Sequence, residues 1–222
     1  MTKKPGRQAP KTKTYRQTRV KGNTEEPSFI EIARRKQILD VALELFAEKG
    51  FQRTSLSDIA TILKISKGVI SYHFDGKEDL GEQALRHGLS NYSKFVKNQL
   101  NNYKSSTEKL LRFPHACLAY VHEHQNDYLM YLDIQSSFAS LEDRRRFIAE
   151  QDRGLRRLLV GLIEDAKEEG GIADVDPGPV ADILQATVDG LSGMECADPG
   201  AANLGACEEL FRGWLQQYLA AK

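Results

Sequence analysis

The stretch from Ser55 to Phe74 constrains the fold of this chain more than any other. Its first half places apolar side chains three and four residues apart, which is the spacing of one face of a helix: Leu56, Ile59, Ala60 and Leu63. Ser55 and Asp58 stand three residues apart at the start of this pattern, like the two partners of a capping box. The pattern therefore predicts a short helix that begins after Ser55.

A second short helix is expected after a break at residues 64–67. The hydroxyl of Ser66 can accept a backbone N–H at the start of this helix. Ile70 and Phe74, four residues apart, can anchor it to a core. Two short helices joined by a tight turn form a helix-turn-helix, in which the second helix enters the major groove of DNA and the first crosses the phosphate backbone.

The side of the second helix opposite Ile70 carries polar, aromatic and small residues: Lys67, Gly68, Ser71, Tyr72 and His73. A glycine inside a helix costs about 1 kcal/mol relative to alanine, so Gly68 indicates a close approach that needs the missing Cβ. A small three-helix domain that only packs against itself has the same apolar periodicity. The periodicity alone therefore leaves DNA binding and a purely structural role open.

Several short motifs occur together between residues 34 and 84: Phe46, Gly50-Phe51, Thr54-Ser55, Asp58-Ile59-Ala60, Ile65-Ser66-Lys67-Gly68, Tyr72-His73-Phe74 and Lys77-Glu78-Asp79-Leu80. In this combination they resemble the N-terminal DNA-binding domain of the tetracycline-repressor (TetR/AcrR) family. The resemblance implies an all-α protein with an N-terminal three-helix helix-turn-helix domain that binds a palindromic operator as a homodimer. It also implies a larger C-terminal helical domain that dimerises and holds a small-molecule effector, with repression as the family's usual outcome.

The resemblance also implies which residues meet double-stranded DNA. Ser55 and Lys77 would hold phosphates, and the second helix would face the groove. The full set of expected DNA-binding residues is Thr54, Ser55, Ser66, Lys67, Gly68, Ser71, Tyr72, His73 and Lys77. The chain departs from the family pattern at Lys64, where glycine is frequent, and at Ser71, where an aromatic residue is frequent. The first departure puts a lysine into the turn, and the second removes a side chain that could stack or contact phosphate.

Charge is distributed unevenly, although the 31 Lys and Arg residues balance the 31 Asp and Glu residues over the whole chain. Residues 1–80 carry 16 basic and 10 acidic side chains, which fits a DNA-binding head on an acidic body. Residues 1–24 are basic, contain no acid and are interrupted by proline and glycine. We expect residues 1–28 to be a disordered basic arm that either follows DNA phosphates or only keeps the chain soluble.

Helical periodicity continues to the C-terminus, and no stretch shows a convincing strand alternation. Helices are expected at about 28–49, 77–103, 107–124, 127–137 and 141–169, then a loop at 174–178 and two more helices. We therefore divide the chain into the arm at 1–28, a helix-turn-helix DNA-binding domain at 29–78, and an effector-binding and dimerisation domain at 79–222.

The last two helices carry apolar stripes that could form a four-helix bundle between two subunits. The residues expected at this dimer interface are Val180, Leu184, Val188, Leu191, Phe211, Trp214 and Tyr218. Pattern alone equally allows an intramolecular core, and the family resemblance favours the dimer.

Aromatic residues and methionine on the body's helices can leave an apolar cavity for a small-molecule effector. The candidates are Phe113, Cys117, Tyr120, Met130, Tyr131, Ile134, Phe138 and Leu162. Each of them also fits a core position, and none of them indicates which ligand binds.

Other classes of function lack support in the sequence. His115 and His122 are too far apart for one tight metal site, and no ligand set completes them, so neither a metal nor a cofactor is expected. No nucleophile or phosphate-loop motif indicates an enzyme. Three unpaired cysteines, no membrane-spanning run and no signal peptide predict a cytoplasmic protein without membrane contact.

A second hypothesis treats the chain as a helical module that binds a small molecule or a protein without sequence-specific DNA binding. Gly68 beside Tyr72 and His73 argues against this hypothesis, because a purely structural helix has little reason to display them together.

Overall fold

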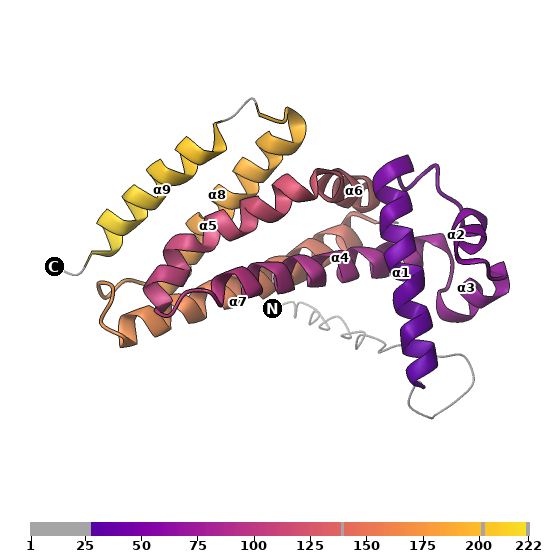
Figure 1. Cartoon of the computed structure of the whole chain (residues 1–222), viewed down its shortest axis with the longest axis horizontal. Coiled ribbons are helices and arrows are strands. Elements are labelled where there is room, and N and C mark those ends of the chain that lie inside the picture. The colour runs from indigo at the N-terminus through magenta and orange to yellow at the C-terminus, as the bar shows by residue number, and fades with distance from the viewer. Residues whose placement is uncertain (1–27, 139, 201–202, 221–222) are drawn as a thin grey trace, which may run out of the picture.

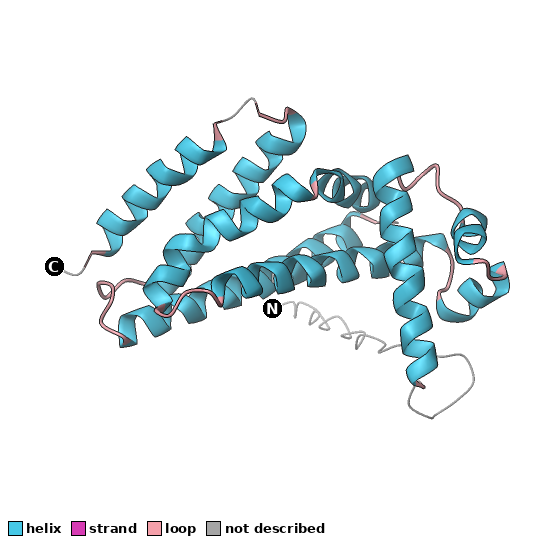
Figure 2. Ribbon diagram, in the orientation of Figure 1, coloured by secondary structure: helices cyan, strands magenta, loops and turns pink. Residues whose placement is uncertain are grey.

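The computed structural model describes residues 28–138, 140–200 and 203–220, and every regular element in these ranges is a helix (Figure 1, Figure 2). The all-α class is therefore confirmed. The helices are α1 Phe29–Lys49, α2 Leu56–Leu63, α3 Lys67–His73, α4 Lys77–Leu100, α5 Ser106–Glu123, α6 Gln125–Ser136, α7 Leu141–Glu168, α8 Pro177–Ala197 and α9 Leu204–Leu219. Residues 1–27, nearly all of the predicted arm, lie outside the described residues, and Ser28 is the N-cap of α1.

The helix-turn-helix forms where the local signals predict it. Ser55 caps α2 in a capping box with Asp58, and Gly50 ends α1 with a φ of 84°. Lys64 ends α2 in the left-handed conformation, with φ 54° and ψ 41°. Glycine adopts this conformation more readily than lysine does. This preference explains why glycine is frequent in the family at this position.

Two local predictions need correction. Ser66 precedes α3 but makes no side-chain cap hydrogen bond. Its backbone carbonyl accepts from Val69 N–H at 3.0 Å instead. The predicted loop at 174–178 ends earlier, because Pro177 is the first residue of α8 and Asp176 caps it by accepting Gly178 N–H at 3.1 Å. A proline suits the first helical position, where its missing N–H would have had no intrahelical partner.

The helices form a head of α1–α3 and a body of α5–α9, and α4 runs from one to the other (Figure 1). The hydrophobic core of the head is built mainly by α1–α3 and the start of α4, with Phe46 and Phe51 in edge-to-face contact at 5.1 Å between ring centroids. The body completes this core with three buried side chains from α6 and α7: Met130, Ile134 and Phe147. The expected division between residues 78 and 79 therefore falls inside α4, and the two parts share one core.

A specific joint fixes the head against the body. The backbone N–H of Phe51 donates to the Asp133 carboxylate on α6 at 2.6 Å. The Phe51 ring packs on Gly81 of α4, where an added Cβ would lie 2.6 Å from the ring and 3.4 Å from Ile134 Cγ2. Gly81 is thus a glycine because the ring occupies the space of a side chain.

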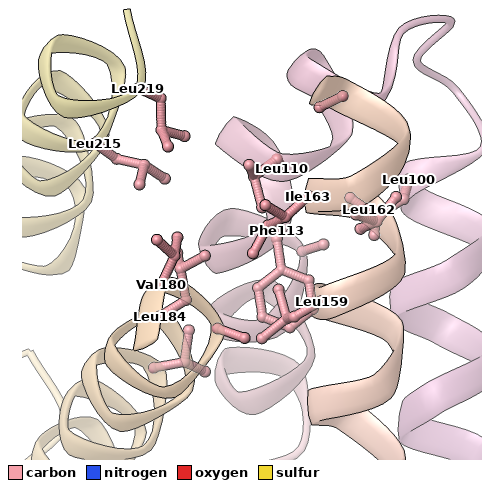
Figure 3. Packing of buried hydrophobic residues seen from close by; sticks show 14 of the residues in the cluster. Leu100, Leu110, Phe113, Leu159, Leu162, Ile163, Val180, Leu184, Leu215 and Leu219 are labelled. Atoms are coloured by element: carbon pink, nitrogen blue, oxygen red, sulfur yellow. The ribbon is translucent and has the colours of Figure 1, made fainter. Parts of the chain in front are cut away.

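The body has its own core, to which α4, α5, α7, α8 and α9 contribute. Figure 3 shows the Phe113 ring beside Leu159 and places Leu184 to one side, on another helix of the same core, and each of these side chains is fully buried. The last helix joins this core through Leu215 and Leu219. Burial of these side chains is the main force that holds the body together.

The joint at Gly81 leads to a stability prediction. Gly81→Ala is expected to lower the free energy of unfolding by about 1–3 kcal/mol, because the added methyl group displaces the buried Phe51 ring. Gly161→Ala in α7 is the matched control, since nothing lies within 4 Å of a Cβ built there. That variant is expected to gain up to about 1 kcal/mol from helix propensity. Urea denaturation followed by circular dichroism measures both, and equal stabilities would contradict this packing.

Candidate functional site

The third helix presents a surface that the core does not use. Ile70 and Phe74 are buried, with 0% and 2% of their surface exposed. Lys67, Gly68, Ser71 and Tyr72 are exposed on the helix, and Ser66, which precedes it, is exposed as well. The arrangement gives α3 one side for packing and one side for an outside partner.

Thr54 does not belong to this surface. It is 2% exposed, and its hydroxyl donates to the carbonyls of Gly50 at 2.9 Å and Leu45 at 3.3 Å. The prediction that its side chain contacts DNA is therefore wrong. Thr54 instead holds the turn between α1 and α2, because burying its hydroxyl requires these hydrogen bonds.

The two residues expected to hold phosphates already have partners inside the protein. The Lys77 ammonium donates to the carbonyl of Gln52 at 3.0 Å and lies 4.6 Å from the Phe51 ring centroid. The Ser55 hydroxyl donates to the Asp58 carboxylate at 2.7 Å. An incoming phosphate would have to compete with these contacts.

Two residues of α1 position the end of α3, a role that sequence reasoning did not predict. Glu31 accepts a hydrogen bond from the Tyr72 hydroxyl at 2.7 Å. Arg35 donates to the carbonyl of His73 at 2.7 Å and lies over the Phe74 ring at 4.3 Å. These contacts join residues about forty positions apart, so no local pattern could have indicated them.

The same contacts set the protonation of the aromatic residues on α3. Partial burial, followed by the nearby charge of Arg35, lowers the pKa of the His73 imidazole. The hydrogen bond to Glu31 raises the pKa of the Tyr72 phenol and lowers that of the Glu31 carboxyl. At neutral pH, His73 is therefore a neutral hydrogen-bonding group, and Tyr72 is a protonated phenol.

A cleft of about 540 Å³ lies in the body between α4, α5, α6, α7 and α8. Its lining residues are Leu85, Gly88, Leu89, Tyr92, Ser93, Tyr120, Val121, His124, Asp127, Tyr128, Met130, Tyr131, Glu150, Gly154, Leu155, Arg157, Gln185, Asp189 and Ser192. Three apolar side chains of this lining are buried, Leu85, Val121 and Met130, and so is the polar Ser192. The volume is that of a typical small-molecule site.

Three of the predicted pocket residues line this cleft: Tyr120, Met130 and Tyr131. The other five do not, and that part of the prediction is wrong. Phe113, Cys117 and Leu162 belong to the core of the body, in which Figure 3 shows Phe113 and Leu162. Ile134 and Phe138 pack in the core shared with the head. Burial also raises the pKa of the Cys117 thiol to about 12, so it stays protonated.

The predicted dimer residues separate into two groups. Val180, Leu184 and Val188 are buried in the protomer's own core, where Figure 3 shows the first two, so they cannot meet a second copy. Leu191 and Phe211 are partly buried. Trp214 and Tyr218 are 61% and 65% exposed. Further exposed apolar side chains on the same two helices complete what we call the α8/α9 surface: Ile183, Met194, Leu210, Trp214 and Tyr218.

The part of the chain that the structure describes contains neither a membrane-spanning helix nor a cluster of metal-ligating side chains. None of its helices is both long and apolar enough to cross a membrane. No group of three or more His, Cys, Asp or Glu side chains there could hold a metal ion. His115 lies 2.9 Å from Glu208 and His122 lies 3.2 Å from Glu195, each through Nδ1.

Both parts of the chain match known protein families. Residues 38–84 match the bacterial regulatory proteins of the tetR family, and residues 106–220 match the C-terminal part of BetI-type transcriptional repressors. The HTH-type transcriptional repressor KstR2 of Rhodococcus jostii is 28% identical over 148 residues, which cover 64% of this chain and 70% of the relative. The HTH-type transcriptional regulator HbdR of Aromatoleum sp. is 30% identical over 142 residues, which cover 63% of this chain and 60% of HbdR.

Solved structures share the fold. A transcriptional regulator from Saccharomonospora viridis in complex with choline has a TM-score of 0.69 at 20% identity, covering 86% of this chain and 100% of that one. The regulator FadR of Bacillus subtilis in complex with stearoyl-CoA has a TM-score of 0.66 at 20% identity. The match covers 81% of this chain and 96% of FadR. At such low identity the likeness concerns the arrangement of the helices.

The lowered pKa of His73 predicts a pH dependence of stability. Well above pH 6.5 the His73 ring is neutral in both the folded and the unfolded chain, so its titration does not change the free energy of unfolding there. As the pH falls through 6.5, the unfolded chain takes up the proton first, and stability decreases. Urea denaturation at about pH 7.5 and about pH 5.5 should show a smaller loss of unfolding free energy in His73→Gln than in the unmodified protein. The same loss in both proteins would contradict the assignment.

Proposed function

As the chain belongs to the TetR family of bacterial regulatory proteins, we propose that it is a repressor that binds a palindromic operator as a homodimer and releases it when a small molecule fills the cleft. A ligand-responsive DNA-binding regulator acts on the chromosome, so a cytoplasmic location is part of the proposal. The proposal includes no catalytic step and no cofactor.

The observation that carries the proposal is Gly68. A Cβ built there would meet only the Ser66 hydroxyl oxygen, at an ordinary 3.5 Å. Nothing inside the protein therefore requires a glycine at this exposed helical position, although glycine weakens the helix. Close approach of the α3 backbone to DNA supplies a reason, and Lys67 beside it stands at the helix start, where side chains reach base edges in this motif.

A second copy is proposed to bind through the α8/α9 surface. Trp214 and Tyr218 lie four residues apart on α9, and an exposed cluster of large apolar side chains marks an interaction site. A symmetric dimer would present two α3 helices to the two half-sites of a palindrome. Val180, Leu184 and Val188 then act indirectly, because they pack α8 onto the body.

The position of the cleft supports coupling between effector and DNA. Leu85 and Met130 line the cleft and also belong to the core of the head. On the same α6 helix, Asp133 holds the Phe51 amide and Ile134 packs near Gly81. A ligand that displaces Met130 would thus strain the contacts that orient the head, which links the two binding events.

The family does not fix the class of effector. The two related structures described above hold ligands of opposite charge, choline and stearoyl-CoA. The charge and shape of this chain's own cleft must therefore decide which ligand it accepts.

Gly68→Ala tests the proposal, because it should separate stability from DNA binding. The variant is expected to unfold at higher urea concentration, because alanine favours the helix. Its free energy of unfolding should rise by up to about 1 kcal/mol. Its affinity for operator DNA is expected to fall at least about tenfold, because the methyl group blocks the close approach. Fluorescence anisotropy with labelled duplexes covering the DNA upstream of the protein's own gene measures the affinity.

The control for this experiment is Gly161→Ala, which should gain stability and keep full DNA affinity. If Gly68→Ala bound duplexes as tightly as the unmodified protein, α3 would not approach DNA as proposed. If the protein preferred no duplex over random DNA, the second hypothesis would replace the repressor: a helical module that binds a small molecule or a protein without sequence-specific DNA binding.

The dimer proposal predicts that Trp214→Arg gives a monomer, because a charged side chain would have to be buried in the interface. Leu141→Arg is the matched control, since Leu141 is equally exposed at 61% but lies on α7, away from the α8/α9 surface. Sedimentation velocity should report a monomer for the first variant and a dimer for the second. A dimer that survives Trp214→Arg would place the interface elsewhere.

A further inference from the structure

We propose that Glu31 of α1 is a positioning residue for base recognition, because it leaves the Tyr72 hydroxyl able to accept a hydrogen bond from DNA but not to donate one. The inference rests on the proposed function, which places α3 in the major groove. A residue outside the helix-turn-helix thereby contributes to specificity. The base atoms that suit Tyr72 are then the amino groups of adenine and cytosine.

The Glu31 carboxylate is held from two sides. The first half of α1 lies beside α3 (Figure 1). Glu31 Oε2 accepts the backbone N–H of Ser28 at 2.7 Å, and Oε1 accepts the Tyr72 hydroxyl at 2.7 Å. One turn further along α1, Arg35 donates to the carbonyl of His73 at 2.7 Å. The carboxylate and the end of α3 are therefore fixed relative to each other.

This geometry decides which hydrogen bond the Tyr72 hydroxyl has left for an outside partner. A phenol has one O–H to donate and can also accept, whereas an ionised carboxylate only accepts. The hydrogen bond from Tyr72 lowers the pKa of the Glu31 carboxyl, which is therefore ionised at neutral pH. The single hydroxyl proton is thus directed at Glu31, and the phenol oxygen remains free only as an acceptor.

Tyr72 is open to such a partner. Its side chain lies on the side of α3 that the core does not use, and the residue is 45% exposed. The His73 ring meets the Tyr72 ring edge to face, with 5.0 Å between the centroids. The position of the Tyr72 side chain is therefore set at both ends, by His73 at the ring and by Glu31 at the hydroxyl.

An acceptor in the major groove distinguishes between bases. Adenine N6 and cytosine N4 donate hydrogen bonds there, whereas guanine O6 and N7 and thymine O4 only accept them. Phosphate oxygens also only accept, and the negative charge of Glu31 beside the hydroxyl further disfavours a phosphate contact. The Glu31–Tyr72 pair therefore favours adenine or cytosine over guanine and thymine on the contacted strand.

The test is selection of bound sequences from a random duplex pool by four full-length proteins: the unmodified chain, Glu31→Ala, Tyr72→Phe and the double variant. The unmodified chain is expected to prefer adenine or cytosine on one strand at one position of each half-site. Both single variants should reduce this preference about two- to tenfold, the range expected for one hydrogen bond. The double variant should match Tyr72→Phe, because without the hydroxyl Glu31 has nothing to orient.

Ser28→Ala is the matched control for a purely structural role of Glu31. It removes the hydroxyl that accepts the Glu31 N–H at 3.3 Å, and so weakens the capping box without removing the Tyr72 contact. This variant is expected to keep the base preference. Affinity for a random duplex, measured by fluorescence anisotropy, should not fall in Glu31→Ala, because a negative charge is removed. Circular dichroism verifies that all variants fold.

Three results would overturn the inference and leave the proposed repressor in place. They are an unchanged base preference in Glu31→Ala or Tyr72→Phe, an equal loss of preference in Ser28→Ala, and a preference for guanine or thymine at the position that Tyr72→Phe alters. If the unmodified chain selected no motif at all, the proposed function would fail, and the inference would fail with it.

Discussion

The hydrophobic core shared by the head and the body is the interaction on which the rest of the structure depends. Phe51 sits at its centre, with its amide on Asp133 and its ring against Gly81. The orientation of the helix-turn-helix is therefore set by α4 and α6, which are two of the five helices that line the cleft. Because these contacts are packed and hydrogen-bonded, we propose that a ligand in the cleft also changes the position of the head.

The recognition surface follows from rules that act over a few residues. A capping box at Ser55 starts α2, and the left-handed Lys64 ends it. Ile70 and Phe74 then fix which side of α3 faces inward. What remains outside is one side of a short helix, with a glycine that the protein itself does not need, and we propose that this side reads DNA.

Sequence predicted the parts of the molecule that local signals determine, and failed where tertiary packing decides. The helices, the cap at Ser55 and the two sides of α3 could be predicted because spacing of three and four residues fixes them. Thr54 was misassigned because only the folded turn reveals that its hydroxyl is buried. Val180 and Leu184 were misassigned because an apolar stripe looks the same whether it packs within a subunit or between two.

The measurement that tests this account most directly is selection of bound sequences from a random duplex pool by the purified protein at near-physiological salt. A symmetric dimer that presents two α3 helices is expected to select a palindromic motif whose half-sites lie about one helical turn apart. Recovery of no motif, with binding that only weakens as salt rises, would contradict it and leave non-specific phosphate attraction as the protein's contact with DNA.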